Sequence, residues 1–281
     1  MPAVQPTIAD KRRIFQQLHR SGCFVIPNPW DAGSAQFLQV LGFKALATTS
    51  AGFAWSQARR DGALTREQVL EHLAQMVAST DLPVNADFER GFAHEPAVLA
   101  ESVRLAVQTG VAGLSIEDAT GEAAGPLYDL DTAVERMRAA RRAIDAAGGD
   151  TVLVGRTECF SVGRPDLDQT IARLKAYADA GADCLYAPGL RTREQISAVV
   201  AAAAAASRPV NVLAGLAPAL TVDELAALGV RRVSVGGALA RAAWGGFMRA
   251  ARQIAEQGRF DELAGAASGK ELNALFSGGG A

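Results

Sequence analysis

Four apolar runs of this chain end in polar residues that together could form one acidic, metal-binding pocket. In the run PVNAD, Asn85 and Asp87 point to the same side, because side chains alternate along a strand. A carboxylate and an amide oxygen that share a cavity can bind Mg²⁺, or Mn²⁺, directly or through water. Alternatively, Asp87 caps the following helix or pairs with Arg90.

Two adjacent acids, Glu117 and Asp118, end the run GLSIED. Buried carboxylates need partners, and an Mg²⁺ ion shared with Asp87 would supply one. The alternative is that both acids bind loop backbone or Arg156.

Arg156 ends the third run, VLVGRTE. A guanidinium group at the end of a strand suits bidentate recognition of a carboxylate or phosphate. It could also form a structural ion pair with Glu117 or Glu158, and both descriptions can hold at once.

The fourth run, ALATTSAG, ends in small residues: Thr49, Ser50, Ala51 and Gly52. Small residues let backbone N–H groups approach an anion closely, with a hydroxyl group to assist, although an ordinary tight turn has the same composition. Further along, Asp61 in RRDG is either a pocket carboxylate or a turn or cap residue.

The elements that must position these residues are eight strands separated by amphipathic helices. The strand candidates are near-continuous apolar runs, as expected for parallel strands covered by helices. They are residues 23–27, 45–49, 83–87, 113–117, 151–156, 183–187, 209–213 and 232–235. Eight strand–helix units predict a (β/α)₈ barrel, in which the carboxyl ends of the strands face the active site. No G-x-G-x-x-G follows a strand, which argues against a dinucleotide fold.

Helices are expected at residues 65–79, 95–109, 131–147, 166–180 and 221–228, most of them followed by glycine. Thr65 and Gln68 have the spacing of a capping box. We expect one barrel domain over residues 1–281, with a C-terminal extension over 259–281. This extension should hold helices at 261–267 and 270–276 and a frayed SGGGA tail.

Composition excludes several functional classes. The 281 residues are 49% hydrophobic and carry a net charge of −2, so the chain can bury a large core but has no basic stripe for nucleic acid. Three cysteines without C-x-x-C spacing indicate neither a zinc site nor a disulfide framework. With no signal core and no membrane-length apolar run, we expect a soluble, cytoplasmic protein. No lysine ends a strand where a Schiff-base aldolase needs one, and none of the three histidines has ligand spacing.

Five segments, in order, resemble motifs of the phosphoenolpyruvate mutase/isocitrate lyase superfamily. ATTSAG resembles the loop that binds a 2-oxo-acid carboxylate, and RRDGALTREQ a loop with an aspartate before a helix. NADFERG resembles Asp-x-Asp-x-Gly-x-Gly, SIED the Leu-Glu-Asp metal segment, and GRTECF the segment Ala-Arg-Thr-Asp/Glu. The resemblance extends from NPWDAGSA to the eighth strand and its helix.

This resemblance implies a (β/α)₈ barrel with an Mg²⁺ ion bound largely through water, and a 2-oxo-acid or enolate substrate. By matching position, Asp87 and Glu117, with Asn85 beside them, would hold the metal. The substrate carboxylate and enolate oxygen would contact Arg156 and the small-residue loop (Thr49, Ser50, Ala51 and Gly52), and Asp61 would be a pocket carboxylate. Catalytic roles would fall to Asp61, Glu117 and Arg156. The resemblance also implies a homo-oligomer, a dimer or a tetramer that swaps C-terminal helices.

Two departures narrow the expected reaction. Asn85 stands where the family has its first metal-side aspartate, which lowers the charge of the site. The segment ATGEAAGPLYDLDTA after Asp118 lacks the Cys, His and Lys of the family's lyase gating loop, and it is shorter than the loop of the mutases. We therefore expect a Mg²⁺-dependent lyase that decarboxylates oxaloacetate or cleaves a related C–C bond through an enolate. The alternatives are a phosphorus–carbon bond enzyme (a mutase or a phosphonopyruvate hydrolase) and a non-catalytic 2-oxo-acid binder.

Overall fold

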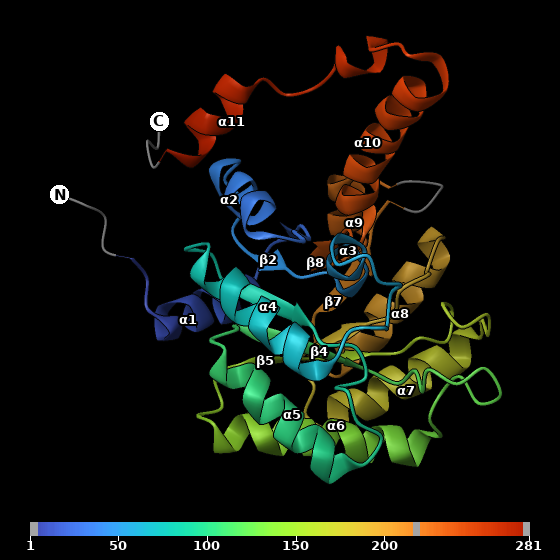
Figure 1. Ribbon diagram of the computed structural model, residues 1–281. Helices are drawn as coiled ribbons and strands as arrows, with labels where there is room; N and C mark the ends of the chain where they lie inside the picture. The colour runs from blue at the N-terminus through green and yellow to red at the C-terminus, as the bar shows by residue number, and fades with distance from the viewer. Residues whose placement is uncertain (1–4, 216–219, 278–281) are drawn as a thin grey trace.

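Eight parallel strands form a nearly closed barrel in a computed structural model that describes residues 5–215 and 220–277 (Figure 1). Each strand lies within a run predicted from the sequence, and the (β/α)₈ expectation is confirmed. The strands are β1 (Phe24–Ile26), β2 (Leu46–Ala47), β3 (Val84–Asp87), β4 (Gly113–Glu117), β5 (Val152–Arg156), β6 (Cys184–Tyr186), β7 (Val210–Leu213) and β8 (Arg232–Ser234).

The edges of the sheet are β1 and β2, and a few hydrogen bonds close the seam between them. The Ala47 amide donates to the Pro27 carbonyl at 3.0 Å. Asn28 is buried beside it; its Nδ2 donates to the Thr48 carbonyl at 2.9 Å. The Asn28 Oδ1 accepts from the amides of Val235 and Gly236 at 2.9 Å each. One amide side chain thus joins the ends of β1, β2 and β8.

Helices surround the barrel between the strands (Figure 1). The Thr65–Gln68 capping box is present, and Gly110 and Gly181 follow α5 and α7 with φ angles of 90° and 102°, as predicted for left-handed C-terminal positions. The helices are α1 (Ile8–Leu18), α2 (Ala32–Val40), α3 (Ser50–Ser56), α4 (Arg66–Ala78), α5 (Pro96–Gln108), α6 (Leu130–Ala146), α7 (Leu167–Asp179), α8 (Arg193–Ala205) and α9 (Val222–Ala227).

Apolar side chains fill part of the barrel interior. Phe24 and Ile26 from β1 and Val152 and Val154 from β5 belong to one buried cluster. Phe15 of α1 joins this cluster and is fully buried, so α1 covers one end of the barrel. A cavity inside the barrel can therefore open only toward the other end, where the strands finish.

The C-terminal extension differs in part from the expectation. After α10 (Ala238–Gln257) comes η1 (Asp261–Leu263), a single 3₁₀ turn where a helix over 261–267 was expected. Gly265 follows this turn, and the N-cap of α11 (Gly269–Phe276) at Ser268 begins a new helix, so the first one cannot continue. α11 packs on α2, with the Phe276 ring against Gly33 (Figure 1).

Within the described ranges, no helix is both long and apolar enough to span a membrane. The last four residues of the glycine-rich tail lie outside these ranges.

Candidate active site

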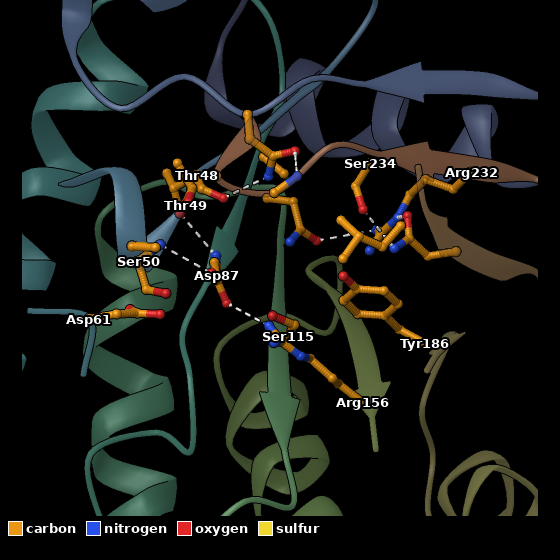
Figure 2. A pocket seen from close by; sticks show the side chains of 18 residues that line it. Thr48, Thr49, Ser50, Asp61, Asp87, Ser115, Arg156, Tyr186, Arg232 and Ser234 are labelled. Atoms are coloured by element: carbon orange, nitrogen blue, oxygen red, sulfur yellow. Dashed lines mark hydrogen bonds and ion pairs between the residues drawn. The ribbon is translucent and has the colours of Figure 1, made fainter. Parts of the chain in front are cut away.

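A cavity of about 180 Å³ lies inside the barrel toward the carboxyl ends of the strands (Figure 2). Every strand, or the loop directly after it, contributes to its wall, which explains why residues far apart in the sequence meet there. The lining residues are Asn28, Ala47, Thr48, Thr49, Ser50, Ala51, Asp61, Asn85, Asp87, Ser115, Arg156, Tyr186, Asn211, Leu213, Arg232, Ser234, Gly236 and Gly237.

Asp87 joins the β2–α3 corner to β5. Its Oδ2 accepts from the Ser50 amide at 3.1 Å, and its Oδ1 accepts from Arg156 Nη1 at 3.1 Å. The Thr48 hydroxyl accepts from the Asp87 amide at 2.9 Å, which fixes the strand end. The predicted pairing of Asp87 with Arg90 is not what the structure shows; the partner is Arg156.

The small-residue loop begins α3. Thr49 is the N-cap, and its hydroxyl accepts from the Gly52 amide at 3.2 Å, so that N–H group is used within the loop. Ser50 and Ala51 line the cavity, whereas Gly52 lies behind it. A Cβ atom on Gly52 would lie 2.6 Å from the Thr49 methyl group and 3.0 Å from Trp30, so the tight packing of this corner requires glycine.

Arg156 is surrounded by three carboxylates. Asp87 lies 3.1 Å away, Glu117 Oε2 is 3.3 Å from Nε, and Glu158 also pairs with Nε. The Arg156 guanidinium also lies over the Tyr186 ring, 5.2 Å from its centroid. Burial alone would lower the pKa of Arg156, but these carboxylates raise it well above its usual value. The expected ion pairs of Arg156 with Glu117 and Glu158 are present, and its side chain lines the cavity, while its role in binding a substrate stays a prediction.

The carboxylates of this region outnumber its cations. Burial raises the pKa of Glu117. Burial and the nearby Asp87 charge raise the pKa of Asp61, and the same two causes, with Asp61, raise the pKa of Glu89 to about 7. Glu89 lies next to these acids with a φ of 48°, and sequence reasoning did not select it. Mutual repulsion of this kind is relieved by a bound cation.

Within residues 5–215 and 220–277, no three His, Cys, Asp or Glu side chains gather closely enough to enclose a metal ion. The crowded carboxylates Asp87 and Glu117 nevertheless suit a hydrated Mg²⁺ ion, which keeps several of its waters. Asn85 also lines the cavity, but its Oδ1 lies 3.4 Å from Arg232 Nη1. Its role as a metal ligand therefore stays a prediction, as do the roles assigned to Asp87 and Glu117.

Asp118 faces away from the cavity and has a structural environment of its own. It accepts from the Glu158 amide at 2.8 Å, Arg173 Nη1 at 3.1 Å and the Tyr177 hydroxyl at 2.6 Å. The expectation that Asp118 binds loop backbone is confirmed, while its arginine partner is Arg173 of α7 instead of Arg156. Glu117, the last residue of β4, and Asp118, which follows it, thus have different surroundings, because successive side chains along an extended chain point to opposite faces.

Several lining residues were not predicted. They are polar side chains inside the barrel: Asn28, Ser115, Tyr186, Asn211, Arg232 and Ser234. A sequence signal existed, since polar and apolar residues alternate in both β7 and β8. In a barrel covered by helices, the polar members of such a strand face the interior.

Comparisons with known proteins agree with this geometry. Residues 15–255 match the family described as phosphoenolpyruvate phosphomutase. A Burkholderia cenocepacia structure, provisionally described as a lyase/mutase, is 50% identical with a TM-score of 0.92, covering 96% of this chain and 97% of that one. Oxaloacetate acetylhydrolase in complex with the product oxalate is 25% identical with a TM-score of 0.85, covering 97% and 95%.

Oxaloacetate decarboxylase of Paraburkholderia xenovorans is 29% identical over 199 residues, 68% of this chain and 64% of the relative. The family match covers most of the chain, and its barrel carries the expected polar strand ends. The chain therefore belongs to the phosphoenolpyruvate phosphomutase family and is an enzyme of the phosphoenolpyruvate mutase/isocitrate lyase superfamily.

Proposed function

We propose that this protein is a Mg²⁺-dependent lyase that acts on a small 2-oxo carboxylate through an enolate, by decarboxylating oxaloacetate or by cleaving a related C–C bond. The observation that carries this proposal is the crowding of Asp87, Glu117 and Glu158 around the single guanidinium of Arg156 at the end of the barrel. Oxaloacetate decarboxylase and oxaloacetate acetylhydrolase among the similar proteins support the substrate class.

Each residue has a defined part in this proposal. Asp87 and Glu117 would hold the hydrated metal, with Asn85 beside them. When bound, Mg²⁺ would polarise the 2-oxo group and stabilise negative charge on its oxygen. Arg156, freed from part of its carboxylate shell, would orient the substrate carboxylate and the enolate oxygen. Asp61 would be the second carboxylate of the cavity wall, with a pKa raised by burial and by the charge of Asp87.

The small-residue corner completes the substrate contacts. Thr49 holds the start of α3 in place, and Ser50 and Ala51 present this corner to the cavity. Gly52 allows the corner to pack closely, as its short distances to Thr49 and Trp30 indicate.

The segment after Asp118 supports chemistry that needs few additional groups. It folds back on itself through a bridge between Ala119 and Leu127, and the Tyr128 amide donates to the Asp118 carbonyl at 3.0 Å. The segment is thus fastened to its own barrel strand. Loss of CO₂ from a 2-oxo acid requires no protonated leaving group, so it suits a site without a long acid-bearing loop.

The proposal is tested with a panel of 2-oxo acids, with and without EDTA, read by mass spectrometry. We expect pyruvate formation from oxaloacetate or cleavage of a related acid, lost with EDTA and restored by Mg²⁺. Asp87→Asn and Glu117→Gln should lower kcat by at least 100-fold while circular dichroism stays unchanged. The exposed Glu122→Gln serves as the matched control. Full turnover in both site variants, or in EDTA, would reject the proposal.

The family description itself favours one further candidate, a phosphorus–carbon bond reaction. Phosphorus NMR of phosphonopyruvate with the protein and Mg²⁺ distinguishes it: a new phosphate or phosphoenolpyruvate signal supports that reaction. Stabilisation by 2-oxo acids without turnover of any of them would instead indicate a non-catalytic binder.

We also propose a homo-oligomer assembled through the C-terminal helices. Large apolar side chains of this region are exposed, among them Phe247 on α10, Phe260 after it and Phe276 on α11. α10 extends from the barrel, and a long connection leads from its far end to α11, which packs on α2 (Figure 1). Light scattering of the full chain and of a chain ending at Gly258 tests this, with dissociation expected for the shorter one.

A further inference from the structure

Arg232 is a buried cation in the floor of the cavity. It is the first residue of β8, is 3% exposed and lines the cavity. No Asp or Glu of the described ranges lies within ion-pair distance of its guanidinium. Arg156, in contrast, is surrounded by three carboxylates. The cavity therefore has one neutralised guanidinium near its opening and one that is not neutralised at its floor.

The position of Arg232 follows from the strand register. Arg156 is paired with Tyr186, Tyr186 with Asn211, and Asn211 with Arg232. Arg156 is the last residue of β5, near the opening, whereas Arg232 is the first residue of β8, near the floor. The four register partners therefore form a row of side chains that runs from the opening of the cavity to its floor. Figure 2 shows Arg232, Ser234 and Tyr186 across the cavity from Ser50, Asp61 and Asp87.

Neutral groups position the guanidinium without satisfying it. Its Nε donates to Asn211 Oδ1 at 3.0 Å, and Nη1 makes two long contacts of 3.4 Å, to Asn85 Oδ1 and His19 Nε2. Burial and the Arg232 charge lower the pKa of His19 to about 3, so this imidazole is neutral and offers a lone pair.

Arginine has five N–H donors. Within residues 5–215 and 220–277, the Nη2 group of Arg232 has no hydrogen-bond acceptor. It is also absent from the polar atoms that are fully shielded from solvent and lack a partner, so part of its surface is accessible. It is therefore exposed to the cavity. Ser234 lies two residues further along the same strand, and its hydroxyl accepts from Asn211 Nδ2 at 3.0 Å, which leaves the hydroxyl proton available to a ligand.

A buried charge without a counter-ion is costly, and a bound anion removes that cost. We propose that Arg232, with Ser234 and the Tyr186 hydroxyl, is a second anion subsite that binds the distal carboxylate of the substrate. The enzyme would then select 2-oxo dicarboxylates over 2-oxo monocarboxylates. The inference rests on the proposed function for the placement of the 2-oxo end near Arg156 and Asp87.

The subsite also distinguishes between the reactions of the proposed function. When a carboxylate leaves as CO₂, its negative charge moves away from any guanidinium paired with it, so such pairing opposes decarboxylation. We therefore expect the carboxylate bound by Arg232 to remain on the product fragment that is released by the cleavage, instead of leaving as CO₂. This favours cleavage of the C–C bond between the 2-oxo end and the fragment that carries the distal carboxylate over loss of that carboxylate as CO₂.

Binding of two stable acids of equal chain length tests the subsite. 2-Oxoglutarate and 2-oxopentanoate differ only in the distal carboxylate, and their Kd values are measured by calorimetry in Mg²⁺ at constant ionic strength. We expect wild type to prefer 2-oxoglutarate by at least 10-fold, because its distal carboxylate would accept charge-assisted hydrogen bonds from Arg232. Arg232→Gln should reduce this preference to less than 3-fold and leave the Kd of 2-oxopentanoate within 2-fold. Arg232→Lys should retain an intermediate preference.

Arg231→Gln is the matched control. Arg231 precedes Arg232 on the chain, and its side chain binds the Gly22 carbonyl outside the cavity, so the variant should keep the wild-type preference. An unchanged preference in Arg232→Gln, or no preference in wild type, would overturn the subsite. Failure of the proposed function has a different signature, namely no Mg²⁺-dependent turnover of any 2-oxo acid while the dicarboxylate preference persists.

Discussion

Glu117 and Asp118 are adjacent acids that should respond to substitution in opposite ways. Asp118→Ala removes the carboxylate that accepts from Arg173, Tyr177 and the Glu158 amide. The Asp118 and Arg173 side chains are only 2% and 7% exposed, so the variant leaves a buried guanidinium without its counter-ion. Breaking such a pair typically lowers the free energy of unfolding by about 3–5 kcal/mol.

For a chain of this size, that loss corresponds to a fall in Tm of roughly 5–9 °C. Glu117→Gln should instead leave the stability almost unchanged and impair function. It removes one of three carboxylates crowded around Arg156, and burial already raises the pKa of Glu117, so loss of its charge should change stability by less than about 1 kcal/mol. Metal affinity and turnover, however, should fall sharply.

Both variants are compared by differential scanning calorimetry and by titration calorimetry with MgCl₂ at a temperature where each is folded. The double variant Asp118→Ala/Tyr177→Phe should be less destabilised than the sum of the single variants, because the partners share one network. The reasoning is wrong if Asp118→Ala retains its Tm but loses Mg²⁺ binding, or if Glu117→Gln unfolds while its affinity for Mg²⁺ persists.

Three further predictions concern the barrel. Burial lowers the pKa of His72, which is stacked on Phe53, to about 4. As the pH falls below 6.5, the unfolded chain therefore binds a proton before the folded protein does. The free energy of unfolding should fall by about 2 kcal/mol by pH 5. Urea unfolding at pH 7.5 and pH 5 should show a smaller loss in His72→Leu, and an equal loss would contradict this assignment. Gly91→Ala places a Cβ 2.0 Å from Leu99 Cδ1 at a φ of 72° and should cost about 2–4 kcal/mol by the same assay, with a neutral result counting against it. Asn28→Ala removes three hydrogen bonds and should speed amide hydrogen exchange in β1 and β2 but not in β5. An equal acceleration in all three strands would exclude a role specific to the seam.

The strands were predictable because most of them are near-continuous apolar runs, several of which are followed by polar residues. From the sequence alone, the same periodicity predicted that Asp87, Arg156 and the start of α3 lie together at the carboxyl ends of the strands, as the structure shows. What periodicity could not supply is the partner of each charge. Asp118 pairs with Arg173 and Tyr177, which lie more than 50 positions away on α7. The pairing of β4 with β5 and the packing of α7 on β5 bring them together.

The floor of the cavity was not predicted for a different reason. Asn211 and Arg232 lie at or near the beginnings of their strands, where a barrel normally has apolar filling. The alternation in β8 indicates that Arg232 and Ser234 share one face of the strand, but it does not show how deeply Arg232 is buried. The distinguishing observation is its burial at 3% exposure, which requires coordinates.

The seam between β1 and β2 has a consequence for how the enzyme matures. Asn28 holds the Thr48 carbonyl, and the Thr48 hydroxyl in turn accepts from the Asp87 amide. The two ends of the sheet therefore cannot separate without releasing the corner on which Asp87 depends. A chain whose other strands have paired but whose ring is still open would bind neither metal nor substrate, so the appearance of activity during refolding would report the final closure of the ring.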